Sequence, residues 1–244
     1  MPKLLIFPHS HFCEKARWAL DYKGISYDPV AVMPGLHLKT IRKIAPGTSV
    51  PVLVYEDGLV IQGSSEIIDQ IDSIYPNRQL SPVTVEGRQA CTDIETEMDE
   101  KLGVNIRRIL YSTLLDYPAF IRQCFTHSMP VYKKLAYGMI ASKLNKRIYD
   151  VYVISPAKVT EAKKAFDVAM DQMAKRIEQS PYLVGEQFSR ADLSVAAMLS
   201  LLTQPAEHPF PWGDIPDAKA QAFCDHYREH PVSLWVNKMY QQYR

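Results

Sequence analysis

The first 75 residues alternate short apolar runs with amphipathic stretches, a pattern typical of strands and helices in turn. The run Leu4 to Phe7 predicts a strand, and the stretch Glu14 to Lys23 predicts a helix that ends at Gly24, a natural C-cap. The turn Glu56-Asp57-Gly58 is a hairpin signal between two further strands. The other elements are expected at about 25–32 (strand), 38–44 (helix), 50–55 and 59–62 (strands) and 65–75 (helix, capped by Gly63 or Ser64). The order βαβαββα predicts a small mixed sheet with helices on its faces, an α/β domain.

Strand signals largely vanish after residue 76, where a turn-rich segment without periodicity begins. We therefore expect an α/β domain at 1–76, a linker at 77–84 and an all-helical domain at 85–244.

Apolar residues spaced three and four apart predict the helices of this second region. Ser155-Pro156 has the cap-then-proline form of a helix start, and Ser189 to Asp192 has the form of an N-capping box. The helices are expected at about 85–115, 117–137 with an interruption near 130, from 156 to about 177, from the 189–192 box through the apolar run 193–202, at 218–229 and at 233–240.

Composition narrows the class of protein. The chain has 244 residues, of which 47% are hydrophobic, enough for one large or two smaller packed domains. Its 28 basic and 27 acidic side chains leave no charge excess to attract nucleic acid or an anionic membrane. The four-residue apolar run before Pro8 is too short for a signal peptide, and no run reaches the roughly 18 residues of a membrane span. We expect a soluble cytoplasmic protein with neither a nucleic-acid nor a membrane partner.

The four cysteines, Cys13, Cys91, Cys124 and Cys224, are widely spaced. They form neither a CxxC pair nor a zinc-type set with histidines, which favours free thiols in a reducing compartment and no bound metal.

We expect the chemistry where the first strand meets the first helix. Ser10 and Cys13 lie three residues apart at this junction, so they share one helical face. Unpaired backbone N–H groups and the positive end of the helix dipole favour an anion at such a turn. The junction would therefore stabilise the thiolate of a bound ligand. His9 and His11 flank the serine, and we expect them to be packing or solvent-facing rather than catalytic.

Three motifs occur in order in the α/β region: Ser10-x-x-Cys13, Ser49-Val50-Pro51 and Gly63-Ser64-Ser65-Glu66-Ile67. Together with Tyr182 to Gly185 and the 189–192 box, they make the chain resemble the glutathione S-transferase superfamily over nearly its whole length. The resemblance implies a thioredoxin-like N-terminal domain and an all-α C-terminal domain. It further implies a homodimeric detoxification enzyme that uses glutathione as co-substrate, without a metal, to conjugate a small hydrophobic electrophile.

The resemblance also implies roles for particular residues. Ser10 would stabilise the glutathione thiolate by a hydrogen bond, with Cys13 as the alternative active group. If the Val50-Pro51 bond is cis, the Val50 main chain would pair with the tripeptide as an added strand. Ser64 and Ser65 would meet the γ-glutamyl carboxylate at a helix N-terminus. Many members place an acidic residue or glutamine where this chain has Gly63, so the contact to the ligand ammonium stays open.

Two further regions complete the implied site. Lys39, or His37 beside it, would contact the glycine carboxylate of glutathione. The groove for the second substrate would lie between the domains. Its expected residues are Phe12, Arg107, Arg108 and Tyr111, with Tyr132, Tyr137, Tyr149 and Tyr152 as candidates for which packing is the more frequent role. Two alternatives to conjugation remain: a glutathione-dependent thiol reductase that uses Cys13, and a non-catalytic ligand-binding or interaction protein on the same fold.

Overall fold

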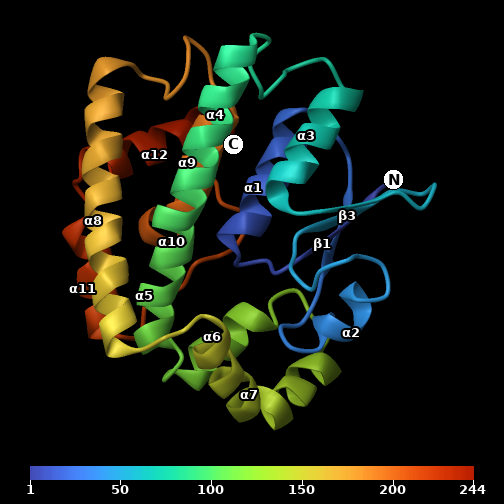
Figure 1. Cartoon of the computed structure of the whole chain (residues 1–244). Coiled ribbons are helices and arrows are strands. Elements are labelled where there is room, and N and C mark those ends of the chain that lie inside the picture. The colour runs from blue at the N-terminus through green and yellow to red at the C-terminus, as the bar shows by residue number, and fades with distance from the viewer.

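A four-stranded mixed sheet forms the N-terminal part of the computed structural model, which describes residues 1–244 (Figure 1). The strand order is β2-β1-β3-β4, with β1 parallel to β2 and antiparallel to β3, and β3 antiparallel to β4. The predicted order βαβαββα is confirmed, although the second strand is four residues long and shorter than expected. The elements are β1 (Lys3–Ile6), α1 (His11–Tyr22), β2 (Asp28–Ala31), α2 (His37–Ile41), β3 (Val52–Val54), β4 (Val60–Gln62) and α3 (Ser64–Ile74).

Strand β1 is buried on both faces, as its unbroken apolar run requires. Leu4 and Ile6 join the main core, whereas Leu5 packs with Ile41 of α2 and Val52 of β3. This alternation places α2 on one face of the sheet and leaves the other face to α1 and α3.

The rest of the chain is helical, and the predicted helix starts at Pro156 and Arg190 are confirmed. The expected long helix over 85–115 exists, but a π-helical turn interrupts it. The helix after Pro130 continues to Val151 rather than ending near Tyr137. The elements are α4 (Val85–Met98), the π-helical turn η1 (Asp99–Val104), α5 (Asn105–Leu114), α6 (Pro118–Phe125), α7 (Val131–Val151), α8 (Pro156–Gln179), α9 (Arg190–Met198), α10 (Ser200–Thr203), α11 (Ala218–His226) and α12 (Pro231–Tyr243).

Helix α9 is buried along its whole length and packs against α1 and α4. The predicted capping box is present at its start, where Asp192 accepts hydrogen bonds from the Ser189 backbone and hydroxyl, both at 2.9 Å. The same carboxylate accepts the Leu183 N–H at 2.8 Å. These three donors allow a carboxylate to sit in the core.

A buried ionic network joins the two parts of the chain. Lys15 of α1 lies 2.6 Å from both Glu95 of α4 and Asp99 of η1. Glu95 also accepts a charge-assisted hydrogen bond at 2.6 Å from Arg190 of α9, and Arg190 in turn pairs with Asp69 of α3. Burial works against the Glu95 carboxylate, but Lys15 and Arg190 outweigh it and hold the Glu95 pKa below its usual value.

All four cysteines are free and buried. None of the helices combines the length and the apolar character needed to cross a membrane. No three His, Cys, Asp or Glu side chains are grouped so that they could hold a metal ion.

Candidate functional site

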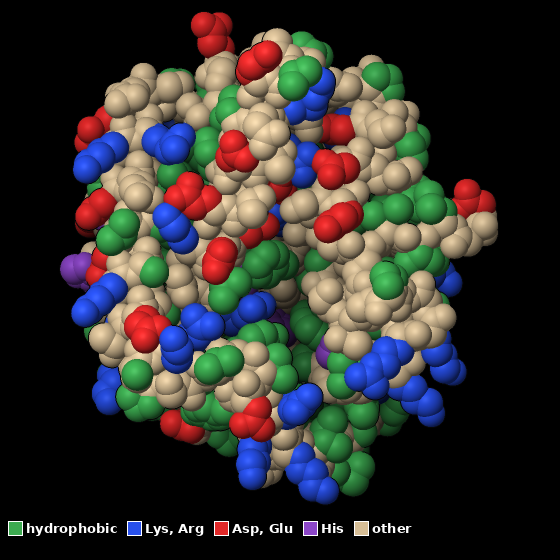
Figure 2. Space-filling model, viewed as in Figure 1, with side chains coloured by type: hydrophobic (Ala, Val, Ile, Leu, Met, Phe, Trp, Pro, Cys, Tyr) green, Lys and Arg blue, Asp and Glu red, His purple; other side chains and the backbone are tan.

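A cavity of about 480 Å³ lies between the sheet region and helices α5, α6 and α7. It opens on the face of the molecule shown in Figure 2, where a hollow near the centre is walled by hydrophobic side chains. Of the residues predicted for the site, Ser10, Phe12, Val50, Arg107 and Tyr111 line this cavity.

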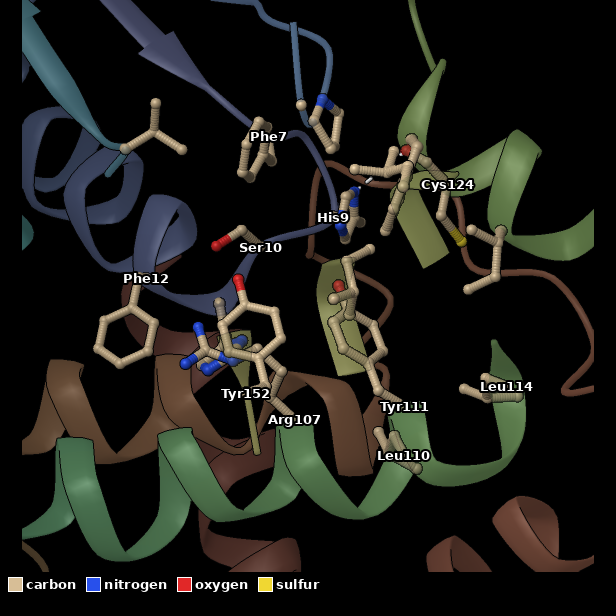
Figure 3. A pocket seen from close by; sticks show the side chains of 18 of the residues that line it. Phe7, His9, Ser10, Phe12, Arg107, Leu110, Tyr111, Leu114, Cys124 and Tyr152 are labelled. Carbon is tan, nitrogen blue, oxygen red and sulfur yellow. Dashed lines mark hydrogen bonds between the residues drawn. The ribbon is translucent and has the colours of Figure 1, made fainter. Parts of the chain in front are cut away.

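Ser10 is the N-cap of α1, at the cavity wall. Its Oγ accepts the Cys13 N–H at 3.4 Å, and its carbonyl accepts the first helical hydrogen bond, from the Glu14 N–H at 2.8 Å. No protein acceptor takes the hydroxyl proton, and Figure 3 shows the hydroxyl pointing into the cavity toward the hydroxyl end of Tyr152. Ser10 can therefore donate a hydrogen bond to a ligand atom in front of the helix N-terminus.

Cys13 is fully buried and does not line the cavity. Burial raises the pKa of its thiol to about 11. The group is thus a neutral thiol near pH 7, and it has no path to a ligand in the cavity.

His9 and His11 are both buried and join the α1 turn to the helical region. His9 Nδ1 donates to the Cys124 carbonyl at 3.1 Å, and His11 Nε2 donates to the Gly103 carbonyl in η1 at 2.9 Å. Burial lowers the pKa of His9 to about 4 and that of His11 well below its usual value. Both rings are therefore neutral at pH 7, and of the two expected roles, packing or solvent-facing, their burial corresponds to packing.

The Val50–Pro51 peptide bond is cis, the condition set for a peptide-binding loop. Gln62 holds this loop, since its Nε2 donates to the Ser49 carbonyl and its Oε1 accepts the Gly47 N–H, both at 2.8 Å. Val50 lines the cavity, whereas Pro51 is buried behind it.

Ser64 and Ser65 open α3 but do not line the cavity. Ser64 is buried, and the Ser65 hydroxyl donates to Glu95 at 2.8 Å and accepts from Lys15 at 3.1 Å. Gly63 is the N-cap, with φ of 110°, and a Cβ on it would collide with the Glu66 carboxylate. The larger residue that many members carry at this position would not fit here without displacing Glu66.

Helix α2 brings one of the two residues predicted for it, His37, to the cavity. Lys39 is exposed and lies outside the cavity, whereas His37, Leu38 and Arg42 line it. The spacing of Leu38 and Arg42, four apart, places them on one helical face. That spacing is a sequence signal through which Arg42 could have been found.

Arg107 and Arg108 play different parts although they are adjacent on α5. Arg108 is turned away from the cavity, where it donates to the Tyr152 carbonyl at 3.0 Å and to Asn105 Oδ1 at 3.1 Å. The guanidinium of Arg107 lies 4.1 Å from the centroid of the Tyr152 ring and 5.7 Å from that of Phe12 (Figure 3). Of the tyrosines weighed from the sequence, Tyr152 thus joins Tyr111 at the cavity wall.

Comparison with known proteins identifies the family of the chain. Residues 4–79 match the family described as glutathione S-transferase, N-terminal domain, and residues 135–228 match glutathione S-transferase, C-terminal domain. The chain belongs to the glutathione S-transferase superfamily. This membership confirms the predicted fold class, a thioredoxin-like domain followed by a helical domain. No curated protein sequence matches the chain.

Solved structures of glutathione S-transferases and of a β-etherase share the fold at low sequence identity. One, from Methylobacterium radiotolerans in complex with glutathione sulfonate, is 16% identical with a TM-score of 0.65, covering 99% of this chain and 90% of that one. Another, from Methylobacillus flagellatus with GSH bound, is 19% identical with a TM-score of 0.62, covering 98% and 93%. The β-etherase LigF from Sphingobium sp. strain SYK-6 is 19% identical with a TM-score of 0.64, covering 99% of both chains.

Proposed function

We propose that this protein is a glutathione transferase in which the Ser10 hydroxyl stabilises the thiolate of glutathione for attack on an electrophile bound in the cavity. The observation that supports this most is the position of Ser10, at the cavity wall and the N-terminus of α1, with its proton free for a ligand. The buried Cys13 thiol is unsuited to the alternative role of reductase.

Glutathione is proposed to lie along the cis-proline loop, with its main chain paired to that of Val50. Because the Ser65 hydroxyl is used by Glu95 and Lys15, the γ-glutamyl carboxylate would meet the backbone N–H groups at the start of α3. On α2, His37 and Arg42 are placed better than Lys39 for the glycine carboxylate, since both line the cavity.

The physical effect of Ser10 is electrostatic. A hydrogen bond to a charged group contributes roughly 1.5–3 kcal/mol, and the dipole of a helix N-terminus adds about 0.3–1 kcal/mol. Together these would lower the thiol pKa by about 1–3 units, enough to populate the thiolate near neutral pH. The thiol proton leaves to solvent, and the sulfur lone pair forms the new bond to the electrophile.

Replacement of Ser10 tests the assignment. In Ser10→Ala, kcat with glutathione and a chlorodinitrobenzene should fall by about ten- to hundredfold because the hydrogen bond to the thiolate is lost. Affinity for glutathione, measured by titration calorimetry, should change much less, because the loop and helix contacts remain. Ser142→Ala, an exposed serine on α7, is the matched control and should keep wild-type turnover.

Other outcomes would favour the other functions. Unchanged turnover in Ser10→Ala, with activity lost in Cys13→Ser and a mixed disulfide seen by intact mass, would point to a thiol reductase. A protein that is not retained on glutathione resin and gives no heat with glutathione would be a non-catalytic member of the superfamily.

A further inference from the structure

The charged side chains that line the cavity are all positive. Three arginines line the cavity, Arg42 at the C-cap of α2, Arg107 of α5 and Arg147 of α7, and no aspartate or glutamate does. The histidines at its base, His9 and His11, are neutral at pH 7. The cavity therefore carries a positive potential with no protein anion to balance it, and its walls are otherwise largely apolar and aromatic.

Arg107 is the least exposed of these three arginines, since Arg42 and Arg147 both reach solvent. It takes part in no ion pair and donates no hydrogen bond, and its Nε is fully buried without a partner. Its neighbour Arg108, by contrast, makes two hydrogen bonds to protein acceptors. A guanidinium has five donors in a planar fork, and leaving them unmatched in an apolar surrounding is unfavourable unless an acceptor arrives.

Aromatic rings hold this guanidinium in place. It lies near the faces of Phe12 and Tyr152, with centroid distances of 5.7 and 4.1 Å, and Figure 3 shows it below Ser10 in the same part of the cavity. The ring quadrupoles attract the cation and fix its orientation, but they offer no hydrogen-bond acceptor in the plane of the fork. The cluster is thus a preformed half of a carboxylate site, adjacent to the group that would hold the thiolate.

We propose that the second substrate is an aromatic electrophile that carries a carboxylate, and that Arg107 binds this carboxylate while the rings of Phe12 and Tyr152 contact the aromatic part. The inference rests on the proposed transferase function and specifies its substrate class. The thiolate sulfur forms a bond to the ring carbon that bears the leaving group, and that group departs with its bonding pair as halide. The carboxylate stays unchanged and fixes the ring in front of Ser10. Arg147, which is exposed and lines the cavity, attracts the carboxylate electrostatically as the substrate enters.

A pair of substrates that differ only in charge tests the proposal. The pair is 4-chloro-3-nitrobenzoate and its methyl ester, each measured for kcat/KM with glutathione in the wild type and in Arg107→Gln. The variant should lower the ratio of acid to ester kcat/KM by roughly ten- to hundredfold, because a charge-assisted hydrogen bond is lost for the acid alone. Arg107→Lys keeps the positive charge but lacks the planar fork of donors. Its ratio of acid to ester kcat/KM should lie between those of the wild type and Arg107→Gln. Arg122→Gln, an exposed arginine on α6, removes the same charge outside this cavity and should leave the ratio unaltered.

Equilibrium binding separates this inference from the proposed function. Titration calorimetry without glutathione should show 4-chloro-3-nitrobenzoate binding at least about tenfold tighter than its ester, with the preference lost in Arg107→Gln and kept in Arg122→Gln. Absence of binding, absence of preference in the wild type, or a preference that survives Arg107→Gln in a protein whose thermal unfolding is cooperative would overturn the carboxylate site. Preferred binding without turnover of either compound would instead keep the site and overturn the transferase proposal.

Discussion

Glu95 is the single side chain on which the junction between the two parts of the chain depends most. It is almost fully buried, forms an ion pair with Lys15 and accepts hydrogen bonds from Arg190 and Ser65, and these three partners come from three different helices. Glu95→Gln keeps the shape but removes the charge, so two buried cations lose their shared anion. Breaking such a pair costs about 3–5 kcal/mol, and we expect a loss of this size in the free energy of unfolding measured with urea. Asp93→Asn, exposed on the same helix, should stay within about 0.5 kcal/mol of the wild type; equal effects of the two variants would contradict the argument.

At the residue scale, the sequence predicts those cavity residues whose position is set by a local motif. Ser10 and Val50 are of this kind, because a strand-to-helix turn and an X-Pro bond have strong local preferences. The side chain of Ser65 is directed instead to Glu95, thirty residues away, which no local pattern could indicate. The difference between Ser10 and Cys13 is also tertiary, since a spacing of three places both on one face and only packing decides which of them is buried.

The π-helical turn η1 is the element that sequence periodicity missed. The apolar spacing runs through 85–115 without a break, and a single π turn shifts the register too little to be read from it. Its consequence is local: Gly103 exposes a carbonyl that takes the His11 N–H, and it lies against Met198 and Phe12. The turn thus joins the start of α1, which carries Ser10, to α5, which carries Arg107.

Two glycines in helical segments should respond oppositely to alanine. A Cβ at Gly103 would overlap Met198 Sδ, and because Met198 is fully buried, any movement that relieves the overlap disturbs the packing of the core. Gly103→Ala should therefore destabilise the protein by about 1–3 kcal/mol through overpacking. Gly138 in α7 has no atom within 4 Å of its Cβ position, so Gly138→Ala should stabilise by about 0.5–1 kcal/mol through the higher helix propensity of alanine. Urea unfolding gives the free energy of unfolding of both variants. A change of the same sign in the two would refute the packing argument.

On the scale of the whole molecule, three buried histidines make stability depend on pH. His9 and His11 join the α1 turn to the helical region, and His208 packs beside Arg17 and Arg244. Burial lowers the pKa of His9 to about 4 and that of His208 to about 2, and it lowers the pKa of His11 as well. All three bind protons in the unfolded chain below pH 6.5 but not in the folded one, so their contribution is complete above that pH and is lost as the pH falls.

These pKa values determine how much the free energy of unfolding should fall between pH 7.5 and pH 5.0. His9 and His208 each give up about 2 kcal/mol over the 1.5 units below 6.5, and His11 adds to this loss. Asp192 opposes it by about 1 kcal/mol, because burial raises its pKa to about 6 and the folded state holds that proton longer. Urea unfolding should therefore show at least about 3 kcal/mol less stability at pH 5.0, the sum for His9, His208 and Asp192, with the loss from His11 in addition. His9→Gln should reduce this dependence, whereas the exposed His226→Gln should leave it as in the wild type. Equal stability at the two pH values would show that the buried rings take up protons without unfolding, and the neutral imidazoles assigned to the base of the cavity would then be wrong.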